Sequence, residues 1–200
     1  RPVLAESVPV IQGDQVWNAG YDGSGTVVAI VDSGVDASHP FLGGRVVEEA
    51  CFSTNIAGES QSVCPSGLEQ QFGAGAAARC SRPECMHGTH VAGITAGNGS
   101  SAGQPFSGVA KNAQIMAVQV FSEIVDANFC GGTPPCLGGY TSDVIAGLER
   151  VYAVALAGRN IVSVNMSLGE GAFSEPCDSE PYKPAIDNLR AIGIARVVAS

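Results

Sequence analysis

The sequence predicts an α/β fold in which a mostly parallel β-sheet carries helices on both of its faces. Two observations support this class. Short apolar runs rich in β-branched residues alternate along the chain with segments whose apolar residues recur at helical spacing. Strands that alternate with helices are typical of parallel sheets connected by right-handed crossovers. With 200 residues the chain can bury one sizeable core, so we expect a single domain.

Four apolar runs are predicted to form the strands of this sheet. The first, 27–31, is continuous and β-branched and lies between Gly25 and Asp32, which is typical of a strand buried on both faces. We expect the run 161–165 to be buried in the same way. The remaining strands are predicted at 115–120 and 195–199.

Three segments are predicted to form helices. The clearest begins at Thr141 or Ser142, either of which can cap a helix, has Asp143 in its first turn and ends before Gly158. The others are expected at 91–96, where small apolar residues follow a His-Gly-Thr-His sequence, and at 184–192, where a proline lies near the first turn.

The segment from about 48 to 86 shows neither the alternation of a strand nor the spacing of a helix in its apolar residues. Its content of Gly, Ser and Cys marks a long insertion rather than a layer of the core. Irregular segments of that length are uncommon in compact domains unless they are functional or cross-linked. We therefore expect disulfides to hold this insertion in place.

The cysteines predict an oxidising compartment, because disulfides accumulate in secreted and other extracytoplasmic proteins. Cys130 and Cys136 close a short loop and are expected to be bridged. The four cysteines of the insertion can pair with one another in three ways; they are Cys51, Cys64, Cys80 and Cys85. Cys177 is left over and suggests a partner outside these residues. An alternative is a zinc site, since Cys80, Cys85, His87 and His90 are potential ligands, although their spacing is not a usual structural set.

Composition excludes other classes of function. The formal charge of −9 disfavours binding to nucleic acid or to an anionic membrane surface. No apolar run approaches the roughly 20 residues that span a membrane, and the first residues do not resemble the start of a signal peptide. No Gly-x-Gly-x-x-Gly follows the first strand, so a Rossmann-type nucleotide binder is rejected.

Three segments carry residues of chemical interest: Val-Asp-Ser-Gly-Val at 31–35, His-Gly-Thr-His-Val-Ala-Gly at 87–93, and Val-Asn-Met-Ser-Leu-Gly at 164–169. Asp32 ends one predicted strand and Ser167 follows another, so both should lie along the carboxyl edge of the sheet. A carboxylate there can orient an imidazole, and the imidazole can take a proton from a nucleophile. Asp32 fits the first role and His87 the second.

Taken in order, these segments closely resemble the subtilase family of serine peptidases, from about Val8 to Ser200. The chain is similar to the N-terminal part of a subtilisin-like catalytic domain. The resemblance implies that Asp32 and His87 are catalytic and hydrogen-bonded to each other, and that His90 is a buried structural residue. It also implies peptide pairing by Ser167, Leu168 and Gly169 on one side and by Gly138 and Gly139 on the other, for which a flexible turn is the alternative.

The resemblance implies polypeptide substrates in extended form, the protein's own propeptide as a further partner, and no catalytic cofactor. The family's Gly-Thr-Ser-Met-Ala segment, which carries the nucleophile, is absent. We therefore expect a serine endopeptidase in the full-length protein and no hydrolysis by these residues alone.

Two further points concern a metal and the alternative function. In the secreted bacillus subtilisins a calcium-binding Asp directly follows His-Pro, but Phe41 and Leu42 follow His39-Pro40 here. The sequence therefore lacks that ligand, and a structural calcium elsewhere stays open. The alternative function is a non-catalytic peptide-binding module that keeps the groove but lacks the serine.

Overall fold

A computed structural model describes residues 4–169 and 178–199. Its centre is a six-stranded sheet of order β4-β2-β5-β1-β8-β9, parallel except for β4, and this confirms the predicted fold class. The strands of this sheet are β1 (Val27–Asp32), β2 (Val46–Phe52), β4 (Gln70–Phe72), β5 (Gln114–Gln119), β8 (Ile161–Met166) and β9 (Ala195–Val198). A second sheet of order β3-β6-β7 contains β3 (Ser60–Ser62), β6 (Phe121–Ile124) and β7 (Cys136–Gly139).

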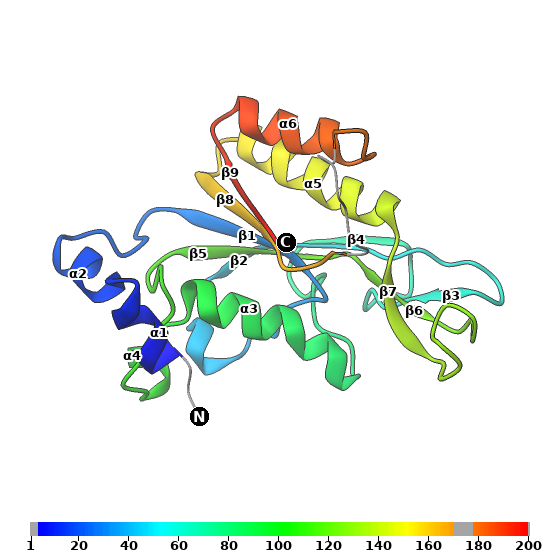
Figure 1. Ribbon diagram of the computed structural model, residues 1–200, viewed down its shortest axis with the longest axis horizontal. Coiled ribbons are helices and arrows are strands. Elements are labelled where there is room, and N and C mark those ends of the chain that lie inside the picture. The colour runs from blue at the N-terminus through cyan, green and yellow to red at the C-terminus, as the bar shows by residue number, and fades with distance from the viewer. Residues whose placement is uncertain (1–3, 170–177, 200) are drawn as a thin grey trace.

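Helices cover both faces of the central sheet, as predicted (Figure 1). One face packs against α5 (Thr141–Leu156) and α6 (Lys183–Ala191), and the other against α3 (His87–Ala96). The remaining helices are α1 (Leu4–Val10), α2 (Gly13–Asn18), α4 (Gly99–Ala102) and the 3-10 turns η1 (Pro40–Leu42) and η2 (Pro83–Met86). No helix in the described ranges is long and apolar enough to cross a membrane.

Local sequence accounts for the central elements. All six residues of β1 are buried, because α3 covers one face of this strand and α5 the other. In α5 the buried positions recur at helical spacing and face the sheet: Val144, Gly147, Leu148, Val151 and Val154. Strand β8 is only half-buried, so the prediction of full burial is wrong, and Val162 on its exposed face is 38% accessible.

The start of α5 differs from its prediction. Tyr140 occupies the N-cap position, and the side chain of neither Thr141 nor Ser142 caps the helix. Asp143 is instead buried and accepts hydrogen bonds from Thr54, from its backbone N at 3.0 Å and from its Oγ1 at 3.0 Å. The first turn of α5 therefore anchors the insertion.

The insertion also differs from its prediction at its beginning. Residues 48–52 belong to β2, which pairs with β5 in the central sheet, so the expectation that this segment stays outside the core is wrong there. The adjacent Glu48 and Glu49 hide the strand from a hydropathy pattern. Glu49 is buried, and its carboxylate accepts hydrogen bonds from the backbone N atoms of Gly75 at 2.9 Å and Ala77 at 3.2 Å.

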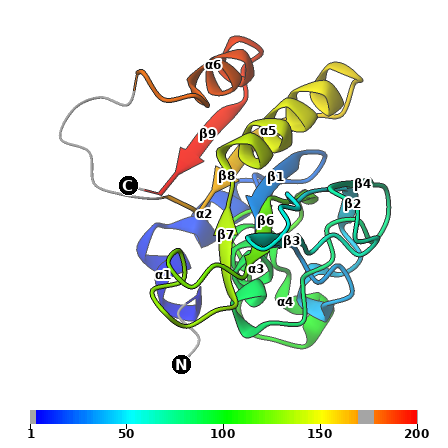
Figure 2. The ribbon, with the colours of Figure 1, turned by 90° about the vertical axis from the view of Figure 1, so that its right-hand side faces the viewer.

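The small sheet lies beyond the carboxyl end of β5, on the side that faces the viewer in Figure 2. Strand β6 follows β5 after a single residue and pairs antiparallel with both β3 and β7. Among the described strands β7 is therefore an edge, with one side unpaired. This edge lies near the carboxyl ends of β1 and β8.

Burial of Asp143 predicts a pH dependence of stability. Burial raises the pKa of Asp143 above its ordinary value of 3.8, and the hydrogen bonds from Thr54 oppose this only in part. The stability that this group contributes is fully present below the unfolded pKa and is lost as pH rises through the folded pKa. Asp143→Asn removes that loss, so we expect the variant to gain stability relative to the parent as pH rises from about 4 to 7.

Urea unfolding of the full-length protein at several pH values measures this difference, with His87→Ala as the common background to prevent self-digestion. Asp187→Asn is the matched control, because an ion pair with Lys183 on the surface lowers the pKa of Asp187. The stability of the control relative to the parent should change little over this range, because the pKa of Asp187 lies below its ordinary value of 3.8 and the contribution of this carboxylate is lost only at more acidic pH. A parallel pH trend for both variants would contradict the role given to burial.

Candidate active site

Asp32 and His87 form a hydrogen-bonded pair at the carboxyl edge of the central sheet. Asp32 ends β1 with a side chain that is 1% exposed, and His87 begins α3 with a side chain that is 53% exposed. His87 Nδ1 lies 2.8 Å from Asp32 Oδ1 and 3.0 Å from Oδ2. The predicted contact is therefore confirmed. A carboxylate oxygen accepts, so Nδ1 donates and Nε2 remains available as an acceptor.

Two hydroxyl groups that sequence reasoning did not single out join the Asp32 and His87 segments. Ser33 Oγ accepts a hydrogen bond from Gly88 N at 3.1 Å, and Ser33 N donates to Asp32 Oδ1 at 2.7 Å. Thr89 Oγ1 accepts from Asp36 N at 2.9 Å. Both hydroxyls lie inside the motifs, Ser33 next to Asp32 and Thr89 two residues after His87, and these short polar side chains were the available signal.

A close backbone approach requires glycine at two positions. A Cβ atom on Gly88 would lie 2.2 Å from the carbonyl oxygen of Gly34, so no larger residue fits there without displacement. Gly34 itself has φ +94°, and a Cβ on it would meet the Ala77 carbonyl oxygen at 2.9 Å. That carbonyl accepts from Val35 N at 2.8 Å, and Glu49 binds the backbone N of the same Ala77. The insertion thus supports the turn that follows Asp32.

A cavity of about 640 Å³ opens beside the pair. Its lining comes from five segments: Asp32 and Ser33; Pro83, Glu84 and His87; Phe121; Cys136 and Leu137; and Ser167, Leu168 and Gly169. The structure therefore brings the predicted residues 167–169 to the Asp-His pair. Pro83, Glu84, Phe121 and Leu137 are lining residues that sequence reasoning missed, because nothing in their local pattern ties them to the motifs.

Gly138 and Gly139 form the end of β7 and pair with Ser122 and Phe121 of β6. The segment is a strand, so the alternative of a flexible turn is wrong. The residues of β7 that line the cavity are Cys136 and Leu137 rather than the two glycines. The start of β7 and the segment after β8 therefore both border the cavity.

His90 is exposed, so the expectation of a buried structural residue is wrong for the described chain. The α3 residues that face the sheet are Val91, Ala92 and Ala96, and His90 precedes them on the outer side of the helix. No described residue forms a hydrogen bond with its imidazole. His87 contacts Asp32 and lines the cavity, whereas His90, one turn further along α3, does neither.

The cysteines form three disulfides in the described part of the chain. Cys130 is bridged to Cys136, as predicted, and the four remaining candidates pair as Cys51–Cys64 and Cys80–Cys85. Two of the proposed zinc ligands are thus consumed in a disulfide, and His87 contacts Asp32, so the zinc alternative is wrong. Cys177 lies outside the described residues.

The residues at the position of the subtilisin calcium ligand do not fit a cation. Phe41 occupies it, is buried, and packs its ring against Phe106 with centroids 5.6 Å apart. Within residues 4–169 and 178–199 no group of three or more His, Cys, Asp or Glu side chains is placed to hold a metal ion.

A parallel α/β sheet with an Asp-His pair at its carboxyl edge, beside a cavity flanked by a free strand, is the framework of a serine peptidase site. The model of the subtilase family, peptidase family S8, matches residues 23–200. The chain belongs to the subtilase family of serine peptidases, and its buried Asp32 with His87 fits two members of a catalytic triad.

Individual relatives agree with this assignment. Subtilisin DY of Bacillus licheniformis is 32% identical over 193 residues, which make up 96% of this chain but 53% of the relative. The major intracellular serine protease of Bacillus subtilis strain 168 is 28% identical and covers 98% of this chain and 49% of its own. The structure of a Pseudoalteromonas arctica protease matches with a TM-score of 0.63 at 27% identity, over 92% of this chain and 51% of the other. The chain thus spans about half the length of these relatives.

Proposed function

We propose that the protein containing this chain is an extracytoplasmic serine endopeptidase in which Asp32 and His87 act together with a serine outside these 200 residues. The observation that carries the proposal is the contact of 2.8 Å between His87 Nδ1 and the buried Asp32 carboxylate, beside a peptide-sized cavity. The family supports serine peptidase chemistry, and the three disulfides favour an oxidising compartment. Relatives include an intracellular enzyme, so only the disulfides support an extracytoplasmic compartment.

The chemistry follows from the orientation of the imidazole. With Nδ1–H held by Asp32, His87 Nε2 accepts the proton of the serine hydroxyl as the serine oxygen attacks the substrate carbonyl carbon. The protonated imidazole, stabilised by the carboxylate, then gives that proton to the leaving amine, and water hydrolyses the resulting acyl-enzyme. The residues flanking the cavity bind the substrate in extended form. By themselves the 200 residues lack the nucleophile segment and are expected not to hydrolyse peptides.

The proposal is tested with the full-length protein, casein and a fluorophosphonate reagent that reacts with activated serines. We expect hydrolysis of casein, loss of activity after labelling, and a single labelled serine identified by mass spectrometry. Labelling should depend on His87, because the serine is activated only when the base is present. Peptide binding without hydrolysis or labelling would instead support a non-catalytic peptide-binding module and would overturn the proposal.

A further inference from the structure

Two disulfide-closed loops each contribute a wall to the cavity. The loop closed by Cys80–Cys85 continues through η2 into α3, and it contributes Pro83 and Glu84 to the lining. The loop closed by Cys130–Cys136 continues into β7, which contributes Leu137. One wall thus carries His87 and the other carries the free edge strand.

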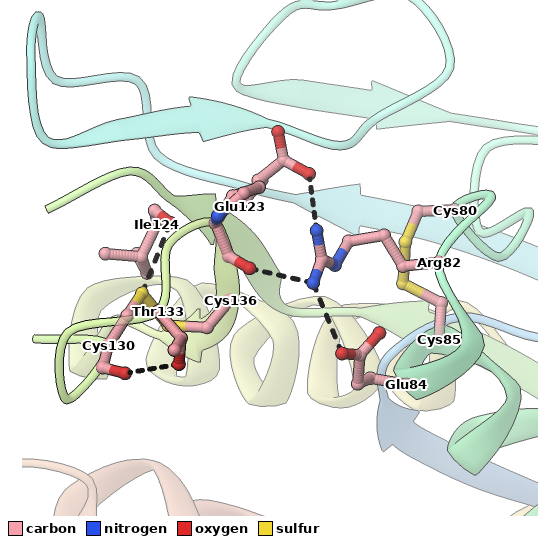
Figure 3. A network of polar contacts seen from close by, with 10 residues as sticks. Cys80, Arg82, Glu84, Cys85, Glu123, Ile124, Cys130, Thr133 and Cys136 are labelled. Carbon is pink, nitrogen blue, oxygen red and sulfur yellow. Dashed lines mark hydrogen bonds and ion pairs between the residues drawn. A yellow bond between two sulfur atoms is a disulfide. The ribbon is translucent and has the colours of Figure 1, made fainter. Parts of the chain in front are cut away.

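Arg82 connects the two disulfide-closed loops (Figure 3). Its Nη2 donates to the carbonyl oxygen of Pro135 at 2.8 Å and to Glu84 Oε1 at 3.2 Å. Its Nη1 lies 3.5 Å from Glu123 Oε2. Pro135 directly precedes Cys136, and Glu123 of β6 is paired with Leu137 of β7. A single guanidinium therefore contacts the loop before His87, the loop closed by Cys130–Cys136, and the strand that pairs with Leu137.

The geometry of these contacts suits arginine specifically. The planar guanidinium presents several donors in fixed directions, so it can hold three acceptors from different segments at once, which a lysine ammonium on a flexible stem does less well. The Arg82 side chain is 23% exposed, and its Nε is buried without a hydrogen-bond partner among the described residues. A buried donor without a partner destabilises a fold.

We propose that Arg82 is a positioning residue for substrate binding, whose guanidinium holds the Leu137 wall of the cavity at a fixed distance from the His87 wall and so sets the side chain that the cavity accepts. This inference rests on the proposed function, because the cavity is taken to be the substrate cleft. Arg82 does not line the cavity and does not touch substrate. Its effect is exerted through Leu137 and through the loop that leads to His87.

The test measures selectivity rather than activity alone. A set of tetrapeptide substrates changes one position at a time from Ala to Phe, and kcat and KM are determined for the full-length protein and its variants. For the substrate position that binds in the cavity, the parent should discriminate between the Ala and the Phe peptide. Arg82→Met should reduce the ratio of their kcat/KM values by about tenfold, a size typical of pocket fit. The change should appear mainly in KM, with kcat altered by less than about twofold.

Matched variants separate positioning from stability. Arg79→Met removes an exposed arginine from the same segment and should keep the parental selectivity. Arg82→Lys should keep part of the selectivity, because the charge remains but the planar donors are lost. If Arg82→Met fails to fold, Glu123→Gln should show a smaller shift in the same direction. A lower unfolding temperature with unchanged selectivity in the Arg82 and Glu123 variants would overturn the inference.

Binding of the same peptides to the His87→Ala protein tests the role of Arg82 without relying on peptidase activity. If the protein proves not to be a peptidase but binds these peptides, loss of selectivity in Arg82→Met would still support the positioning role. Equal dissociation constants for the Ala and Phe peptides in the parental cavity would contradict it. A catalytically active protein whose selectivity does not depend on Arg82 would leave the proposed function intact and refute the inference.

Discussion

Replacing His87 by alanine in the full-length protein is expected to abolish peptidase turnover while the protein stays folded. The imidazole is half-exposed at the start of α3, and its contact of 2.8 Å with Asp32 serves orientation rather than core packing. In subtilisin-type triads, the loss of a member is known to lower turnover by roughly four to six orders of magnitude. Casein or fluorogenic-peptide hydrolysis measures the loss, and thermal unfolding verifies the fold.

His90→Ala is the matched control for this experiment, since it removes the same side chain from the next turn of the same helix. His90 is exposed and does not contact Asp32, so its loss should change turnover by less than about threefold, within the range of ordinary surface substitutions. If folded His90→Ala lost turnover while His87→Ala kept it, the assignment of the base would be wrong.

Replacing Gly88 by alanine is expected to destabilise the protein by more than about 4 kcal/mol, or to prevent folding, because a Cβ at this position would lie 2.2 Å from the Gly34 carbonyl oxygen. The obstacle is backbone rather than the end of a flexible side chain, so it cannot move without displacing the turn after Asp32. Any folded fraction should have low activity, since the same shift separates Asp32 from His87. Denaturant unfolding and activity per folded molecule measure both effects.

Gly93→Ala tests whether the destabilisation by Gly88→Ala comes from the contact with the Gly34 carbonyl oxygen or from replacing any glycine of the helix. A Cβ on Gly93 would meet the nearest ring atom of Phe41 at 3.4 Å, an ordinary contact. The helix gains roughly 0.5–1 kcal/mol when alanine replaces an interior glycine, so Gly93→Ala should be neutral or stabilising. Similar destabilisation by both substitutions would contradict the steric explanation.

Much of the fold follows from local sequence. The buried run that became β1 and the helical spacing of α5 each carry their own periodicity, and that periodicity suffices to place a strand or a helix. The position of Asp32 at the end of a parallel strand then places it at the functional edge of the sheet. The pairing of Cys130 with Cys136 was also predictable, because only five residues separate them.

Other features depended on contacts between segments that are distant in sequence. Strand β2 was missed because Glu49 is polar, yet its carboxylate is buried through hydrogen bonds to backbone atoms more than 25 residues away. The pairing of Cys51 with Cys64 was one of three arrangements that spacing allowed, and the strand geometry selected it. Arg82 resembles any loop arginine until the fold brings Pro135 and Glu123 to it.

The sequence by itself thus determined the strands β1, β5, β8 and β9, the helices α3, α5 and α6, the candidate pair of Asp32 and His87, and the family, because each is recorded in short patterns of residue type. Tertiary structure decided which segments line the cavity, why His87 contacts Asp32 and His90 does not, and why Gly88 must lack a side chain. Those properties are set by distances between atoms of separate segments. A hydrogen bond or a steric contact of 2 to 3 Å depends on the packing of the whole sheet, and no local period of the chain encodes it.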